Sequence, residues 1–196
     1  MWLERISGGG VDLIDLQDAK DYLRLLSDET DTEVAAAISA ASDFLDVDED
    51  GFGGLGFPLV QQQWALKSAS FGTGGLRLPF ARIASVDEVR YMAADGHPRT
   101  VSSQDYLLVK CGRGWRIELL AGKCWPEAAD RPDAVEVRFT SGWPSAELVP
   151  GDIKQAARVL VGFYFDTRMF SEKQDIPAQV SSAVDNLTRR YRRFAI

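Results

Sequence analysis

Hydrophobic residues recur with a helical spacing near both ends of the chain and with an alternating spacing in the middle. The first helical stripe consists of residues three or four positions apart: Leu16, Ala19, Leu23 and Leu26. A second stripe has a similar spacing: Val34, Ile38, Ala41 and Leu45. Asp15 is the expected N-cap of the first helix, and Thr30 with Glu33 forms a capping box that would open the second. The pattern therefore predicts two helices before about residue 50.

The middle of the chain, from about residue 58 to 145, alternates between apolar and polar residues. This period of two is typical of half-buried strands. The predicted strands lie near residues 61–68, 83–92, 106–109, 115–119 and 135–139. Glycine-rich and Asp-Gly turns separate several of them. Short strands with polar turns predict an antiparallel sandwich or a small barrel.

Helical spacing returns after residue 147. Asp152 and Gln155 are expected to cap one amphipathic helix, and Pro177 is expected to begin a final helix that continues to Phe194. The prediction is an α+β fold, in which N- and C-terminal helices form a helical bundle around an antiparallel β insertion. The expected parts are an N-terminal helical part (1–57), a β-rich insertion (58–147) and C-terminal helices with a docking tail (148–196).

Charge is distributed unevenly along the chain. The net charge is −7 and the isoelectric point is near 4.8. Residues 12–50 hold thirteen acidic and two basic side chains, whereas residues 150–196 hold eight basic and five acidic ones. A general nucleic-acid binder needs a positive surface, so this class of protein is not expected, although charge alone does not exclude local contact with DNA.

The C-terminal end concentrates positive charge and aromatic area in six consecutive residues: Arg189, Arg190, Tyr191, Arg192, Arg193 and Phe194. One reading is that arginines near a helix C-terminus complement the helix dipole. Four arginines within five positions exceed that need. Arginine favours carboxylates, phosphates and aromatic faces, and aromatic rings add rigid apolar area. We therefore expect a tail that binds a partner.

Two motif matches fall between the second predicted helix and the first predicted strand. Residues 46–51 match half of a calcium loop, but position twelve would be Phe57, where a bidentate Glu is needed. Residues 51–56 match a dinucleotide fingerprint by letter, but they follow a predicted helix rather than a strand and run into Pro58. Both matches are interpreted as an acidic helix end and a glycine-rich loop. No metal or cofactor is predicted.

Catalytic residues are not predicted either. His97 is the one histidine of the chain and lies among turn residues, which favours a solvated hairpin tip over a catalytic base. Cys111 and Cys124 are too few for a zinc site, and whether they form a disulfide stays open. A metal-dependent hydrolase that uses the acidic segment 46–50 is the weakest alternative. We expect a protein that is not an enzyme.

We predict neither a secretory signal nor a membrane-spanning segment. The first residues lack the apolar segment of a secretory signal, and the longest apolar run, near residues 159–165, is far shorter than the ~20 residues of a membrane span. Synthesis in the cytoplasm and no membrane contact are therefore expected.

The order of these segments resembles that of the head–tail connector (adaptor) proteins of tailed bacteriophages, including those of gene transfer agents. The opening helix resembles residues 16–24, and the alanine-rich second helix resembles residues 31–41. Similar strands and passages follow at residues 61–64, 76–79, 83–86, 95–96, 135–142 and 149–156. Residues 176–192 resemble the family's last helix. The ordered set covers nearly the whole chain.

The resemblance implies a structural protein of the virion neck, made in a host bacterium. Such proteins form a homo-oligomeric ring, usually twelve-fold, under the portal protein. The ring extends the channel for double-stranded DNA during DNA packaging and supports a stopper or tail-terminator protein. The basic tail at residues 189–194 would then bind the portal, and oppositely charged faces would join the subunits. The candidates for subunit contacts are Asp18, Asp21, Arg24, Arg158 and Arg168. Another tail-completion or neck module is the main alternative.

Overall fold

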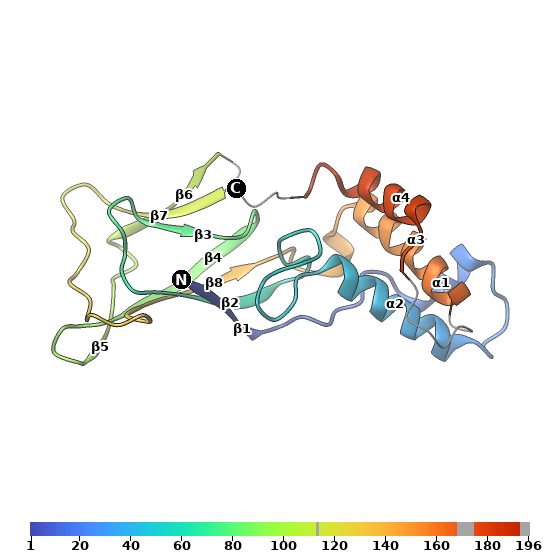
Figure 1. Cartoon of the computed structure of the whole chain (residues 1–196), viewed down its shortest axis with the longest axis horizontal. Helices are drawn as coiled ribbons and strands as arrows, with labels where there is room; N and C mark the ends of the chain where they lie inside the picture. Colours follow the sequence, from blue (N-terminus) through green and yellow to red (C-terminus); the bar gives the residue numbers. More distant parts are fainter. Residues whose placement is uncertain (113, 168–174, 193–196) are drawn as a thin grey trace.

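The computed structural model describes residues 1–112, 114–167 and 175–192. Figure 1 shows the strands at one end of an elongated molecule and the helices at the other. In chain order, the elements of the described residues are β1 (Trp2–Ser7), α1 (Leu16–Leu23), α2 (Asp31–Leu45), β2 (Gln62–Ser68), β3 (Leu76–Leu78), β4 (Ile83–Met92), β5 (Pro98–Thr100), β6 (Tyr106–Cys111), β7 (Gly114–Leu119), β8 (Val135–Ser141), the short 3₁₀ helix η1 (Ala146–Leu148), α3 (Gly151–Thr167) and α4 (Ala178–Thr188). The predicted α+β fold with an antiparallel β insertion is confirmed.

The strands form two antiparallel sheets. The larger sheet has the order β1-β2-β8-β4-β5, and the smaller one has the order β3-β7-β6. At the centre of the larger sheet, Trp64 of β2 lies opposite Phe139 of β8, and both side chains are fully buried. Side chains on β8 alternate between buried and half-buried along its whole length, which is the pattern that predicted it. The alternating middle of the sequence is therefore explained by sheets with one face on the core.

The helices pack through the apolar stripes that the sequence predicted. The stripe of α2 is buried against α3, and α4 packs on the other side of α3. Fully buried alanines on α2 and α3, such as Ala41 and Ala156, permit a close approach of the two backbones. The predicted N-cap of α1 is confirmed, because the Asp15 carboxylate accepts a hydrogen bond from the Asp18 amide at 2.7 Å.

Two details at the N-terminal helices are wrong in the sequence prediction. The capping box does not form: Thr30 has φ −108° and ψ 12°, away from the extended backbone of a capping residue, and its side chain makes no capping hydrogen bond. Leu26 does not belong to the first stripe, because α1 ends at Leu23 and Arg24 turns the chain with φ 58°. Leu26 is consequently fully exposed.

Strand β1 was not predicted. It pairs with β2 at the edge of the larger sheet, where its side chains are exposed or half-buried. An edge strand with no fully buried residue leaves little alternation in the sequence.

The last helix is also shorter than predicted, because α4 ends at Thr188 and residues 189–191 form a turn. The predicted continuation of this helix to residue 194 is therefore wrong, and residues 193–194 lie outside the described part of the chain. Helix α3 likewise begins at Gly151, one residue before the expected cap Asp152.

Several loop interpretations are confirmed. Residues 46–61 connect α2 to β2 without forming a regular helix or strand of their own. His97 lies exposed at the β4–β5 hairpin, where the Asp95 carboxylate accepts a hydrogen bond from the His97 amide. Cys111 and Cys124, whose pairing the sequence left open, are both free. Among the described residues, no helix is long and apolar enough to cross a membrane.

Candidate docking site

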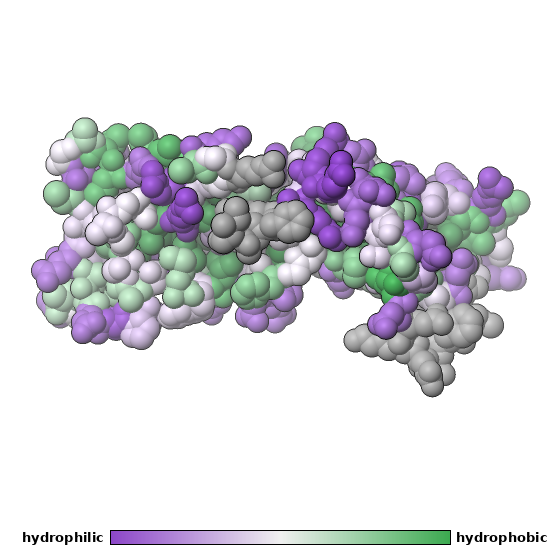
Figure 2. Space-filling view, turned by 45° about the horizontal axis from the view of Figure 1, so that its top comes forward, coloured by the Kyte–Doolittle hydropathy of each residue, from purple (hydrophilic) through white to green (hydrophobic). Residues whose placement is uncertain are grey.

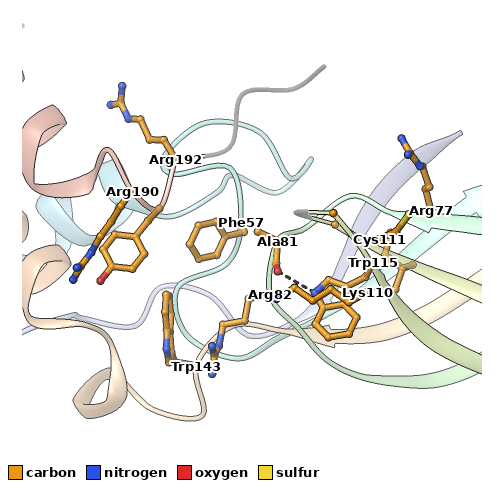
Figure 3. Close-up of a pocket in the computed structure, with 14 residues that line it drawn as sticks. Phe57, Arg77, Ala81, Arg82, Lys110, Cys111, Trp115, Trp143, Arg190 and Arg192 are labelled. Carbon is orange, nitrogen blue, oxygen red and sulfur yellow. Dashed lines mark hydrogen bonds between the residues drawn. The ribbon is translucent and has the colours of Figure 1, made fainter.

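A cleft of about 710 Å³ lies between the smaller sheet and the segment that follows α4 (Figure 3). The described residues that line it include five basic and four aromatic side chains and no acidic one: Arg77, Arg82, Lys110, Arg190, Arg192, Phe57, Trp115, Trp143 and Tyr191. They come from β3 and the loop after it, β6, β7, the segment after β8, the loop before β2, and the chain after α4. A positive aromatic cleft on a protein of net charge −7 is a candidate docking site.

Trp143 is the centre of the aromatic contacts on the helical side of the cleft. Its ring lies 5.7 Å from the Phe57 ring and 6.5 Å from the Tyr191 ring, both centroid to centroid. The Arg82 guanidinium stacks over the Trp143 ring at 4.6 Å from its centroid (Figure 3). Gly142, with φ 111°, lets the chain turn here, since a Cβ would come within 2.5 Å of a backbone oxygen. Trp143 is therefore held as a half-buried ring just after the end of β8.

The sheet side of the cleft carries cations without carboxylate partners. Trp115 is fixed by a hydrogen bond from its indole nitrogen to the Ala81 carbonyl at 3.0 Å. Lys110 lies opposite Trp115 in the β6–β7 ladder, and Arg77 projects from β3 between two buried leucines. Within the described chain, Arg77, Arg82 and Lys110 have no ion pair with a carboxylate. Their charge is available to a partner that brings negative groups.

The arginines after α4 fold against the body of the protein rather than extending a helix. The Arg190 guanidinium pairs with Asp152 at the start of α3 at 2.6 Å, and the Arg192 guanidinium pairs with Asp185 of α4 at 2.7 Å. Arg190 also lies over the Tyr191 ring at 4.8 Å from its centroid. Arg189 is exposed. The structure thus places three of the six predicted portal-binding residues, Arg190, Tyr191 and Arg192, in the lining of the cleft; Arg193 and Phe194 lie outside the described residues.

The predicted subunit-contact residues have roles within one chain. Both oxygens of Asp18 accept hydrogen bonds from Arg158, at 2.8 and 2.7 Å, and join α1 to α3. These hydrogen bonds hold the pKa of Asp18 below its ordinary value. Asp21 accepts a hydrogen bond from Gln17, and Arg24 supplies the left-handed turn after α1. Arg168 lies outside the described residues. Contact of these residues with a neighbouring subunit stays a prediction.

The acidic residues after α2 accept hydrogen bonds that hold the following loop in place. The Asp46 carboxylate accepts hydrogen bonds from the Val47 and Leu59 amides, each at 2.9 Å, and from the Gln62 side chain at 2.7 Å. Burial raises the pKa of Asp46, and these hydrogen bonds oppose the rise. Asp48 accepts from the backbone amides that follow it in the same loop. No group of three or more His, Cys, Asp or Glu suited to a metal ion occurs among the described residues.

The cleft was not predicted from the sequence. Arg77, Arg82 and Lys110 stand in different segments, and pairing of β3, β7 and β6 in one sheet brings them to the cleft, with Arg77 on the opposite face of that sheet from Lys110. The usable signal was a charged residue within each short apolar strand, Arg77 in β3 and Lys110 in β6.

Comparison with known proteins identifies the family. A model of the head completion protein family matches residues 12–183, and the chain belongs to this family. Among curated proteins, none matches.

Solved structures of similar fold come from gene transfer agent (GTA) particles. A chain from the "Neck of empty GTA particle computed with C6 symmetry" is 22% identical, with a TM-score of 0.69 and coverage of 100% of this chain and 97% of that chain. A chain from the "Virion of native gene transfer agent (GTA) particle" is 23% identical, with a TM-score of 0.66 and the same coverage. A chain from the "Neck of native GTA particle computed with C12 symmetry" is 22% identical, with a TM-score of 0.65 and the same coverage. The family and the shared fold confirm the resemblance to head–tail connector proteins.

Proposed function

We propose that this protein is a structural head–tail connector in the neck of a phage or phage-like particle, such as a gene transfer agent. The observation that carries the proposal is the match of residues 12–183 to the head completion family, together with a fold shared over the whole chain with GTA neck proteins. The role is one of assembly, without enzymatic activity.

In this proposal the protein forms a homo-oligomeric ring under the portal protein and offers a platform to a stopper or tail-terminator protein. The C6 and C12 symmetries named for the similar necks support a ring of several copies, and we favour twelve. In a ring of more than two copies, each subunit uses one surface patch to contact the neighbour on one side and a different patch to contact the neighbour on the other side. Such a contact is heterologous.

The charge of the protein suits passage of double-stranded DNA through the ring. Residues 12–50 carry thirteen acidic and two basic side chains, and Figure 2 shows hydrophilic residues over the helical end as well as over the sheet end. A negative lining gives the DNA backbone no basic groups that would bind it with release of counterions. We propose that acidic helices near the channel let DNA slide.

Portal binding is assigned to the C-terminal residues 189–194. Arg189 is exposed, and Arg190 keeps 67% of its side-chain surface exposed although it pairs with Asp152. An exposed ion pair of this kind contributes little to stability, ~0–1 kcal/mol, so its arginine can exchange partners at low cost. The segment therefore combines accessible arginines with the Tyr191 ring, which is the composition of interface hot spots.

The test is a binding assay with purified portal protein. The variant reverses charge at Arg189 and Arg190 with glutamates, and the matched control reverses charge at Arg99, an exposed arginine on the β5 strand. We expect loss of portal binding in the first variant, normal binding in the control, and normal melting temperatures in both. Removal of residues 193–196 should weaken binding further. Unchanged portal binding in the first variant would refute this assignment.

A further inference from the structure

The loop after α2 presents an aromatic side chain between carboxylates. Phe52 is 71% exposed, and Asp48, Glu49 and Asp50 beside it are exposed as well. We call residues 48–52 the Phe52 loop. A single exposed apolar residue is ordinary on a protein surface. The Phe52 loop differs in two respects. Its backbone is fixed by hydrogen bonds, and its acidic and aromatic side chains are complementary to the basic aromatic cleft on the same molecule.

Hydrogen bonds hold the Phe52 loop in one conformation. The Asp48 amide donates to the Phe52 carbonyl at 2.8 Å, and the Phe52 amide donates back to the Asp48 carboxylate at 2.8 Å. The base of the loop is clamped to the end of α2, because the Leu55 amide donates to the Leu45 carbonyl at 3.0 Å. Gly54 sits so close to this helix end that a Cβ would lie 2.1 Å from a backbone oxygen. A loop fixed before binding loses little conformational entropy when it docks.

The cleft offers the complementary chemistry. Lys110, beside Trp115 on the sheet side, and Arg82, stacked on Trp143, have no carboxylate partner within the described chain. Trp115 and Trp143 supply aromatic walls on its two sides (Figure 3). The Phe52 ring fits between the two tryptophans, and the Asp50 carboxylate, which has no ion pair among the described residues, fits against Lys110.

We propose that the Phe52 loop of one copy docks into the cleft of the neighbouring copy in the ring. The inference deepens the proposed function and rests on it. No residue lines both the cleft and the pocket beside the Phe52 loop, so the two patches are distinct surfaces of one subunit. A contact between two distinct patches is heterologous and can propagate around a closed ring. The partner is thus a second copy of this chain.

In this arrangement, the residues after α4 at the edge of the cleft stay available for the portal. Arg190 and Arg192 already pair with Asp152 and Asp185, whereas Lys110 on the sheet side has no ion pair among the described residues. The Phe52 loop therefore uses the sheet side, and the residues after α4 remain for the portal.

A cross-linking experiment on purified particles tests the proposal, because Cys111 is a natural thiol in the lining of the cleft. The reporter is Glu49→Cys, an exposed position of the same loop that leaves Phe52 and Asp50 in place, in a Cys124→Ser background treated with a short bis-maleimide. We expect a ladder of covalent dimers, trimers and higher multimers, and loss of the ladder when Cys111→Ser is added. The matched control carries His97→Cys at the exposed β4–β5 hairpin in place of Glu49→Cys, and it should give no ladder that depends on Cys111.

Electron microscopy of the same particles distinguishes failure of the docking inference from failure of the proposed connector function. A ring in the neck without a Cys111-dependent ladder overturns the docking of the Phe52 loop and leaves the connector function standing. That result would also be obtained if the cleft held DNA phosphates. Absence of the protein from the neck overturns the proposed function and the docking inference with it. A ladder that stops at dimers contradicts a heterologous contact.

Discussion

Asp46 should be the side chain that most strongly fixes the base of the Phe52 loop. Its carboxylate accepts three hydrogen bonds, from two backbone amides and from Gln62. Asp46→Ala leaves all three donors without this acceptor. A hydrogen bond to a charged group contributes ~1.5–3 kcal/mol, and the cost of burying the carboxylate offsets part of the sum, so we expect a loss of about 3 kcal/mol in unfolding free energy. For a chain of this size, that corresponds to a decrease in Tm of about 6–12 °C.

Asp46→Asn is the matched control. Its amide oxygen can still accept from the Val47 and Leu59 amides, while its amide nitrogen faces Gln62. The Gln62 Oε1 atom has no hydrogen-bond partner among the described residues, so rotation of the Gln62 amide can restore a bond. We therefore expect a loss of about 1 kcal/mol or less for the asparagine variant.

The contribution of Asp46 to folding stability should become more favourable as the pH falls. Burial raises the pKa of Asp46 above its ordinary value of 3.8, so the folded state holds the proton more tightly than the unfolded state. The resulting stabilisation is complete below the unfolded-state pKa and is lost as the pH rises through the folded-state pKa. Relative to Asp46→Asn, the wild type should therefore gain stability on acidification.

Urea unfolding followed by tryptophan fluorescence measures all three proteins. Equal losses for the alanine and asparagine variants at neutral pH would refute the role assigned to the hydrogen bonds. So would a loss below about 0.5 kcal/mol for Asp46→Ala, since that is the size of an ordinary surface substitution.

Three further predictions concern the helices and the C-terminal segment. Arg158→Gln should lower the unfolding free energy by about 1 kcal/mol at neutral pH by removing the partly exposed pair with Asp18. Because that pair lowers the pKa of Asp18, the loss should be present above the ordinary carboxyl pKa and vanish as the pH falls through the lowered one, and a pH-independent loss in urea titrations would contradict it. Gly54→Ala should destabilise by at least about 1 kcal/mol, since its φ of 46° disfavours side chains and a backbone oxygen at the end of α2 blocks the Cβ; an unchanged Tm would contradict this. Tyr191→Ala should remove the edge contact with Trp143 and cost about 0.5–1.5 kcal/mol, seen as a changed tryptophan emission and a lower Tm, with Tyr191→Phe as the near-neutral control.

The parts of the fold that the sequence predicted are those with a strong buried face. Residues such as Val34 and Ile38 on α2 and Val137 and Phe139 on β8 are almost fully buried, so their spacing records the element directly. Strand β1 escaped prediction because its residues are exposed or half-buried at a sheet edge. The end of α4 escaped because the pattern continues past Thr188, while the ion pair of Arg190 is visible only in three dimensions.

The candidate site was predictable only in part. Clustering of arginines at residues 189–193 is a local feature, and so it was visible in the sequence. The cleft is not local, because β3 and β6, which carry Arg77 and Lys110, come to the same cleft only through their pairing with β7. The exposure of Phe52 was hidden for a different reason: in a glycine-rich loop, no periodicity indicates whether an aromatic side chain faces the core or the solvent.

The central claim is tested most directly by electron microscopy of purified particles that contain this protein. The account predicts density for the chain as a symmetric ring between portal and tail, with the residues after α4 against the portal. A neck whose density contains no copy of this chain would contradict the account.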